Sequence, residues 1–323
     1  MKARCFNILT ILFLLTLSAC NNEDALENEI SQIEVDFEVE RFDLILTETN
    51  NLERLSEVKQ NYPFLFPRQI KDTTWLSRIK DDLQQQMFKD GQTVFGDFNV
   101  QKDEIEHLFQ HIKYYDKAFN PPKVITVSDN VDYRNKLVLQ ADLLIINLMN
   151  YLGEKHEFYQ NIPLYFAENM VPSQIVSDIA EQYAKRYAYQ SQRKTLLDEM
   201  IYYGKLLYFK DILAPELSSA SKIGYLPSDV EWAKVNEAQI WSYFVEKEML
   251  FSTNSKLFSR FTAPAPFTKF YLDIDNQSPG RLGQYIGWQI VKAYAERTDA
   301  DIMTLMRTDT DEIFKNSKYK PKR

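Results

Sequence analysis

The chain has 323 residues, with 38 lysines and arginines against 46 aspartates and glutamates, and a formal net charge of −8. That sign argues against nucleic acid as a partner and against membrane binding through a basic surface patch. Aromatic residues make up 14% of the chain and it holds only 8 glycines, which indicates a well-packed globular body.

The N-terminus carries the pattern of a lipoprotein signal peptide. Lys2 and Arg4 precede an apolar run over residues 6–17, which is too short to span a bilayer and has the length of a signal-peptide core. The run ends in Leu-Ser-Ala-Cys, where the small residues suit a peptidase groove and the cysteine thiol takes the lipid. We therefore predict a signal peptide over residues 1–19, with Cys20 lipidated, by palmitate among other chains, and so anchored in a lipid bilayer.

Removal of the leader changes the charge and the cysteine content of the chain. Lys2 and Arg4 leave with it and no acid does, so 36 basic and 46 acidic side chains remain. Cys5 leaves as well and Cys20 is used by lipid, which excludes disulfides, cysteine nucleophiles and cysteine-ligated zinc. We expect a lipid-anchored protein that faces the periplasm, on either the cell membrane or the outer membrane.

The first half of the mature chain is predicted to combine helices with a small sheet. Residues 20–31 are polar and acidic, which favours a short tether, and the alternation over residues 33–40 predicts a half-buried strand. The elements expected next are helices over 42–62, from Thr73 or Thr74 to about 89, and over 102–117, then a strand over 123–127 and a buried strand pair running into a helix over 137–148.

From about residue 155 onward the sequence predicts almost only helices. These are expected over residues 172–189, 195–210, 227–251, 283–297, 301–307 and 309–315, with a proline-rich loop between 264 and 280. We see no repeat and no linker, so we predict one α+β domain over residues 32–318. It should be predominantly helical, with a small sheet in its N-terminal half, and be followed by a basic tail over residues 319–323.

His107 and His111 are the first candidate metal ligands, because residues four apart share one face of a helix. The usual zinc-protease helix has a glutamate directly after the first histidine, and Leu108 stands there instead. We therefore prefer to interpret the two histidines as a surface or partly packed pair. They remain the basis of an alternative hypothesis, a metal-dependent peptidase or hydrolase of the envelope with a non-standard site.

Two later stretches could also carry binding groups. Asn236, Glu237 and Trp241 could line a cleft, although a core helix with a solvated acidic edge is the preferred interpretation. Asp273 and Asp275 alternate as in a calcium loop, but the full ligand pattern is absent and a helix cap with a turn explains them. The sequence therefore predicts no bound metal and no cofactor.

Short stretches spread over the whole chain carry a resemblance to a known family. They include Arg-Phe-Asp at 41–43, Tyr-Pro-Phe-Leu-Phe-Pro at 62–67, Met-Ile-Tyr-Tyr-Gly-Lys at 200–205, Ser-Pro-Gly-Arg at 278–281 and Tyr-Ile-Gly-Trp-Gln-Ile-Val at 285–291. In this order they resemble the GldB gliding-motility lipoproteins of the Bacteroidetes. The resemblance implies a part in gliding motility and the linked type IX secretion apparatus, with other envelope proteins as partners, and implies no enzymatic activity.

A weaker similarity relates this family to predicted zinc peptidases of the gluzincin type. Their first helix carries His-Glu-x-x-His, and a second helix carries a glutamate ligand before a glycine. The matching ligand positions here hold Ala180, Ala184 and Tyr203, and only the general base survives, as Glu181. Alanine offers no lone pair and a phenol is a poor substitute for a carboxylate. The similarity thus implies a degenerate zincin-like fold that has lost its metal, a noncatalytic scaffold or pseudoenzyme with Glu181 as a vestige.

Overall fold

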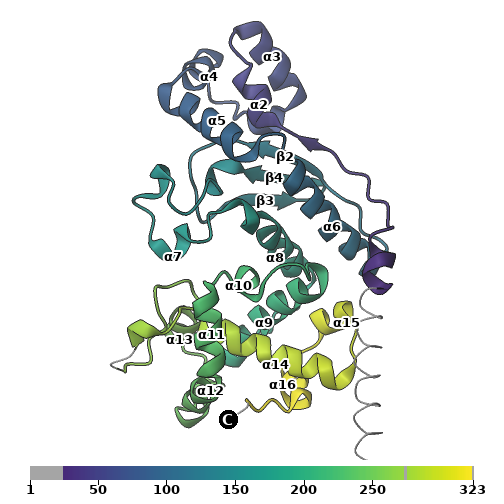
Figure 1. Cartoon of the computed structure of the whole chain (residues 1–323), viewed down its shortest axis with the longest axis vertical. Coiled ribbons are helices and arrows are strands. Elements are labelled where there is room, and N and C mark those ends of the chain that lie inside the picture. Colours follow the sequence, from purple (N-terminus) through teal and green to yellow (C-terminus); the bar gives the residue numbers. More distant parts are fainter. Residues whose placement is uncertain (1–24, 273–274, 322–323) are drawn as a thin grey trace, which may run out of the picture.

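The computed structural model describes residues 25–272 and 275–321 (Figure 1). The predicted signal peptide, Cys20, the first part of the tether and Asp273 lie outside the described residues. Among those described, no helix combines the length and the apolar character needed to cross a membrane. Figure 1 shows the sheet in the middle of the molecule, with α2–α5 at one end and the helices from α9 onward at the other.

A four-stranded mixed sheet occupies the N-terminal half, in the order β1-β2-β4-β3. β1 (Val39–Glu40), β2 (Lys123–Val127) and β4 (Leu143–Asn147) are parallel, and β3 (Leu137–Gln140) is antiparallel to β4. The strand over 123–127 and the strand pair within 137–148 are confirmed. The pair runs into a single 3₁₀ turn, η2 (Leu148–Asn150).

The sheet separates two hydrophobic clusters because neighbouring strand residues point to opposite faces. Val124, Leu144 and Ile146 belong to the main core. Ile125 packs instead with apolar side chains of residues 42–88. All four side chains are fully buried, which explains why β2 and β4 are almost continuous runs of Val, Ile and Leu.

The helices over residues 42–95, which lie between β1 and β2 in the chain, are shorter than the sequence predicted. They are α2 (Phe42–Thr47), α3 (Leu52–Asn61), η1 (Pro63–Leu65), α4 (Asp72–Ile79) and α5 (Asp82–Phe95). The expected helix over 42–62 is interrupted before Asn51, whose side chain accepts the backbone N–H of Arg54. In the same way Asp81 caps a new helix by accepting the N–H of Leu83. Short polar side chains of this kind start helices more readily than they sit inside them.

The main core is built on four long helices that the sequence predicted closely. They are α6 (Asn99–Tyr115), α8 (Ile175–Tyr187), α9 (Leu196–Leu213) and α14 (Leu282–Thr298). Thr195 and Asp198 form a capping box that fixes the start of α9. α9 and α14 cross with their backbones in contact, at Gly204 and Gly287.

Shorter helices connect and cover these four. They are η3 (Glu157–Tyr159), α7 (Leu164–Ala167), η4 (Pro172–Gln174), α10 (Ser219–Ile223), α11 (Pro227–Val235), α12 (Glu237–Glu246), α13 (Ser255–Phe261), η5 (Asp275–Gln277), α15 (Ile302–Arg307) and α16 (Thr310–Ser317). The single helix predicted over 227–251 is therefore two helices that meet at Asn236, whose side-chain amide donates to the carbonyl of Trp232.

Both ends of the described chain are more ordered than expected. Residues 25–30 of the predicted tether are helical, and Ile30 at their end is buried. The side chain of Gln110 donates to the carbonyls of Ser31 and Ile33, which ties this segment to α6. Residues 33–38 are not part of a strand, although the Glu38 carbonyl accepts the N–H of Val124, so the expected strand over 33–40 shrinks to β1.

The predicted basic tail over residues 319–323 begins with an ordered residue, Tyr319. The Tyr319 hydroxyl donates to Oε1 of Glu237 over 2.8 Å. Its ring meets that of Trp241 edge to face at 5.1 Å. A partly buried hydrogen bond and an aromatic contact thus hold the start of the predicted basic tail against α12.

Candidate functional site

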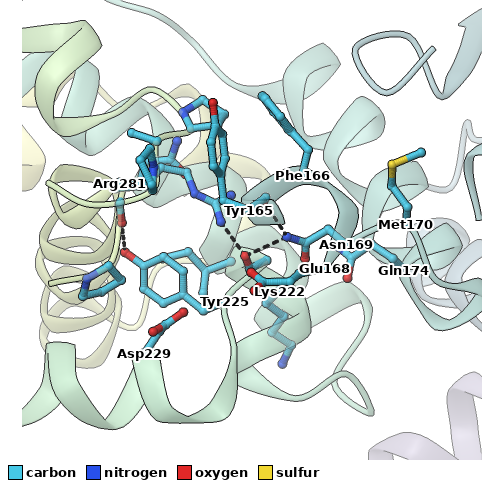
Figure 2. A pocket seen from close by; sticks show the side chains of 18 of the residues that line it. Tyr165, Phe166, Glu168, Asn169, Met170, Gln174, Lys222, Tyr225, Asp229 and Arg281 are labelled. Carbon is cyan, nitrogen blue, oxygen red and sulfur yellow. Dashed lines mark hydrogen bonds between the residues drawn. The ribbon is translucent and has the colours of Figure 1, made fainter. Parts of the chain in front are cut away.

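A cleft of about 600 Å³ opens between the sheet and the C-terminal helices (Figure 2). Its walls come from residues 133–136 before β3, 165–170 around the end of α7, parts of α8 and α9, residues 222–229, and the loop that leads into α14. We call it the charged cleft, because its walls carry lysines, arginines and carboxylates. Its volume lies in the range of about 300–1,000 Å³ that is typical of ligand sites.

Three loops meet on the carbonyl of Gly224. Gly224 ends α10 in the left-handed region, with φ of 69°. Its oxygen accepts one hydrogen bond from Nδ2 of Asn169, at 3.1 Å, and another from the Arg281 guanidinium. Next to it, the Tyr225 hydroxyl donates to the carbonyl of Gly280. Residues far apart in the sequence are in this way held around one opening.

A buried lysine closes the inner end of the cleft. Lys210 on α9 is only 2% exposed. Its ammonium donates to Oγ of Ser177 at 3.1 Å, to the carbonyl of Lys222 at 2.9 Å and to Oε2 of Glu181 at 3.2 Å. One charged group therefore joins α8, α9 and α10, with all three of its donors in use.

Glu181 is held between two lysines. Besides Lys210, the ammonium of Lys185 lies 2.8 Å from its Oε1. Burial alone would raise the pKa of Glu181, but the charges of Lys210 and Lys185 outweigh it and hold the pKa well below the usual carboxyl range. A general base works best with a pKa near the ambient pH, so this carboxylate is poorly suited to take up a proton.

The other positions of the zinc-peptidase pattern lie elsewhere. Ala180 and Ala184 are completely buried in the main core, and Tyr203 is half-buried against it. Of the four, only Glu181 lines the charged cleft. Burial first, then the charges of Glu199 and Glu181, raise the pKa of Tyr203, so its phenol is neutral.

The two histidines do not share an environment. His107 is exposed, whereas His111 is buried. Nδ1 of His111 lies 2.9 Å from the carbonyl of His107 and Nε2 lies 3.1 Å from a carboxylate oxygen of Glu27. Both ring nitrogens thus face oxygen acceptors. Within residues 25–272 and 275–321 no group of three or more His, Cys, Asp or Glu side chains is arranged to hold a metal ion.

Asn236, Glu237 and Trp241 lie outside the charged cleft. The Glu237 carboxylate accepts hydrogen bonds from the hydroxyls of Tyr285, at 3.1 Å, and Tyr319. Glu237 thus joins α12 to α14 and to Tyr319, Trp241 packs against the ring of Tyr319, and Asn236 bonds only to the carbonyl of Trp232.

Asp275 acts as the turn residue that its loop suggested. Its carboxylate accepts the backbone N–H groups of Phe270, Tyr271 and Leu272. Asp275 thus closes a turn with the residues that precede it in the loop.

Sequence reasoning missed most residues of the cleft. Its charged and polar lining includes Lys136, Glu168, Asn169, Asp178, Lys210, Lys222, Tyr225, Asp229 and Arg281. The stretch at 278–281 was noticed only as part of a family resemblance. The available signal was a set of lysines inside otherwise apolar helices, such as Lys210 in Tyr-Phe-Lys-Asp-Ile-Leu, because lysine is rarely buried without partners.

A family model described as gliding motility protein GldB matches residues 23–321. No curated protein and no solved structure matches the chain. The match includes every segment that lines the charged cleft, together with both hydrophobic clusters.

Proposed function

The chain belongs to the family of the gliding motility protein GldB, and we propose that it is a noncatalytic, lipid-anchored component of the gliding machinery and of the linked type IX secretion apparatus. In this proposal Cys20 carries the lipid, the described body faces the periplasm, and other envelope proteins are its partners. Membership in the family supports the role in motility. The link to secretion and the role as a scaffold go beyond it.

The observation that carries the noncatalytic role is the state of Glu181. Two ammonium groups compensate its charge and lower its pKa, so it does not take up protons near neutrality. Ala180, Ala184 and Tyr203 support the same conclusion, since none of them supplies a strong zinc ligand. We include a degenerate zincin-like ancestry of α8 and α9 in the proposal.

An in-frame deletion in a gliding host tests the proposed role. We expect loss of colony spreading and of secretion of a type IX cargo, both restored by the wild-type chain and equally by a Glu181→Gln chain. Glutamine keeps hydrogen-bonding atoms near Lys210 while removing the carboxylate, so it tests chemistry with the least structural damage. Normal spreading and secretion in the deletion strain would refute the role, and rescue by wild type alone would refute the noncatalytic part.

Metal content provides a separate test of the peptidase alternative. We expect the purified chain to carry no stoichiometric zinc, manganese or iron by elemental analysis. Stoichiometric metal that disappears in a His107→Ala, His111→Ala double variant would overturn the proposal in favour of a metal-dependent hydrolase.

A further inference from the structure

The charges on the wall of the charged cleft are not all compensated within the protein. Lys136 pairs with Asp178, Lys210 with Glu181, and Lys222 with Asp211. Four charged lining residues take part in no ion pair with another described residue: Arg134, Arg281, Glu168 and Asp229. The cleft thus presents two positive and two negative groups that a ligand could match.

Arg281 is fixed in place but keeps unused donors. It precedes α14 with a left-handed backbone, and its guanidinium lies 5.3 Å from the centre of the Tyr225 ring. One N–H bond goes to the carbonyl of Gly224. A guanidinium has five N–H donors in a planar fork whose geometry matches a carboxylate, so a cation held in this way is prepared for an anionic group.

Glu168 and Asp229 form the complementary part of the cleft. Burial first, and then the charges of Asp229 and Glu154, raise the pKa of Glu168. Asp229 is held at the start of α11, where its carboxylate accepts the N–H of Leu226. Two neighbouring carboxylates that repel each other in a partly desolvated place are stabilised by a cation that enters between them.

The outer wall of the cleft is aromatic. The Phe166 ring lies 4.6 Å from the rings of both Tyr133 and Tyr165. Such flat surfaces pack against the methylene groups of long side chains and attract ammonium and guanidinium groups. Acidic groups within the cleft and the overall negative charge disfavour a phosphate-rich ligand.

We propose that the charged cleft binds a peptide segment of an envelope partner in which a basic side chain stands next to a carboxylate, with Glu168 and Asp229 facing the cation, Arg281 the carboxylate, and the aromatic wall the aliphatic stem. This inference rests on the proposed function and adds to it the chemistry of the partner. A free amino acid carries the same two charges, so the experiment must separate the two sources.

Peptide binding to the full chain in detergent micelles tests the inference. The probe is fluorescein-labelled Gly-Gly-Lys-Asp-Gly-Gly, read by fluorescence polarisation, beside one peptide with norleucine for lysine and one with asparagine for aspartate. We expect the parent peptide to bind at least about tenfold more tightly than either substituted peptide, since about 1.4 kcal/mol of charge pairing corresponds to that ratio. Free lysine should not compete at the concentration where the unlabelled peptide does.

Matched variants assign the binding to the cleft. A Glu168→Gln, Asp229→Asn double variant should lose the preference for lysine over norleucine, and Arg281→Gln should lose the preference for aspartate over asparagine. A Glu246→Gln, Glu248→Gln control changes the net charge equally at exposed positions and should bind like wild type. Thermal unfolding of each variant verifies that it is folded.

Several results would overturn the inference. These are no binding of the parent peptide, equal binding of the norleucine peptide, equal loss in the exposed control, or full competition by free lysine. None of them touches the proposed function, because that is judged by spreading and secretion of the deletion strain.

Discussion

A Gly287→Ala variant is expected to lose its native fold. A Cβ atom at this position would collide with the carbonyl oxygen of Met200 and lie 3.1 Å from its Cα, both of which are backbone atoms of α9. Backbone cannot move aside as a flexible side chain can, so α9 and α14 would have to separate along their crossing. We expect a loss of about 4 kcal/mol or more in the free energy of unfolding, a large part of the roughly 5–15 kcal/mol that stabilises a typical domain.

The measurement is chemical denaturation followed by circular dichroism, with two companion variants. Gly204→Ala faces the same crossing from the other side, where its Cβ would collide with the carbonyl of Gly287, and should be similarly destabilised. Gly91→Ala is the control, since its Cβ would meet only the end of the Met149 side chain, at 3.1 Å. We expect that change to stay within about 1 kcal/mol of wild type. A Gly287→Ala chain as stable as the control would show that the two helices do not pack in this way.

The long helices could be predicted because their local signals agree with their packing. Thr195 and Asp198 mark the start of α9 in the sequence and form its capping box in the structure. The β-branched run over residues 123–127 likewise predicted a strand, and it forms β2. Errors arose where a short polar side chain outweighed the apolar pattern, which continues across each break. Asn51 and Asp81 cap a new helix, and the Asn236 side chain donates to the carbonyl of Trp232 at the end of α11.

The charged cleft could not be predicted, because its parts lie far apart along the chain. Asn169 and Arg281 meet on Gly224 only after the sheet and α14 are in place. Read singly, Glu168 and Asp229 are ordinary acids of a negatively charged surface. The sequence did single out Glu181. Its environment, however, is set by Lys210, which lies on another helix and reaches Glu181 only in the folded chain.

Replacement of Lys205 by methionine is the second change from which we expect a large effect. Lys205 on α9 is 1% exposed, and its ammonium donates to the carbonyls of Tyr189, Met306 and Thr308. Methionine fills a similar volume but leaves three carbonyl oxygens without this donor. An unpaired buried polar group costs about 1–3 kcal/mol, so we expect a loss of about 3 kcal/mol or more in the free energy of unfolding. Lys155→Met, at a side chain that is 92% exposed, should change it by less than about 0.5 kcal/mol.

The pH dependence of the free energy of unfolding, compared between wild type and Lys205→Met, separates the effect of the Lys205 charge from that of side-chain packing. Burial lowers the pKa of Lys205 to about 8, from 10.5 for the free side chain. Between these values the unfolded chain binds more protons than the folded one, so the contribution of Lys205 to stability increases as pH rises above about 8 and is lost as pH falls through it. The wild-type free energy of unfolding, taken relative to Lys205→Met, should therefore increase from pH 7 to pH 9.5, while ionising tyrosines affect both proteins equally. A difference that stays constant over this range would mean that the three carbonyls stabilise the ammonium fully and that its burial carries no penalty.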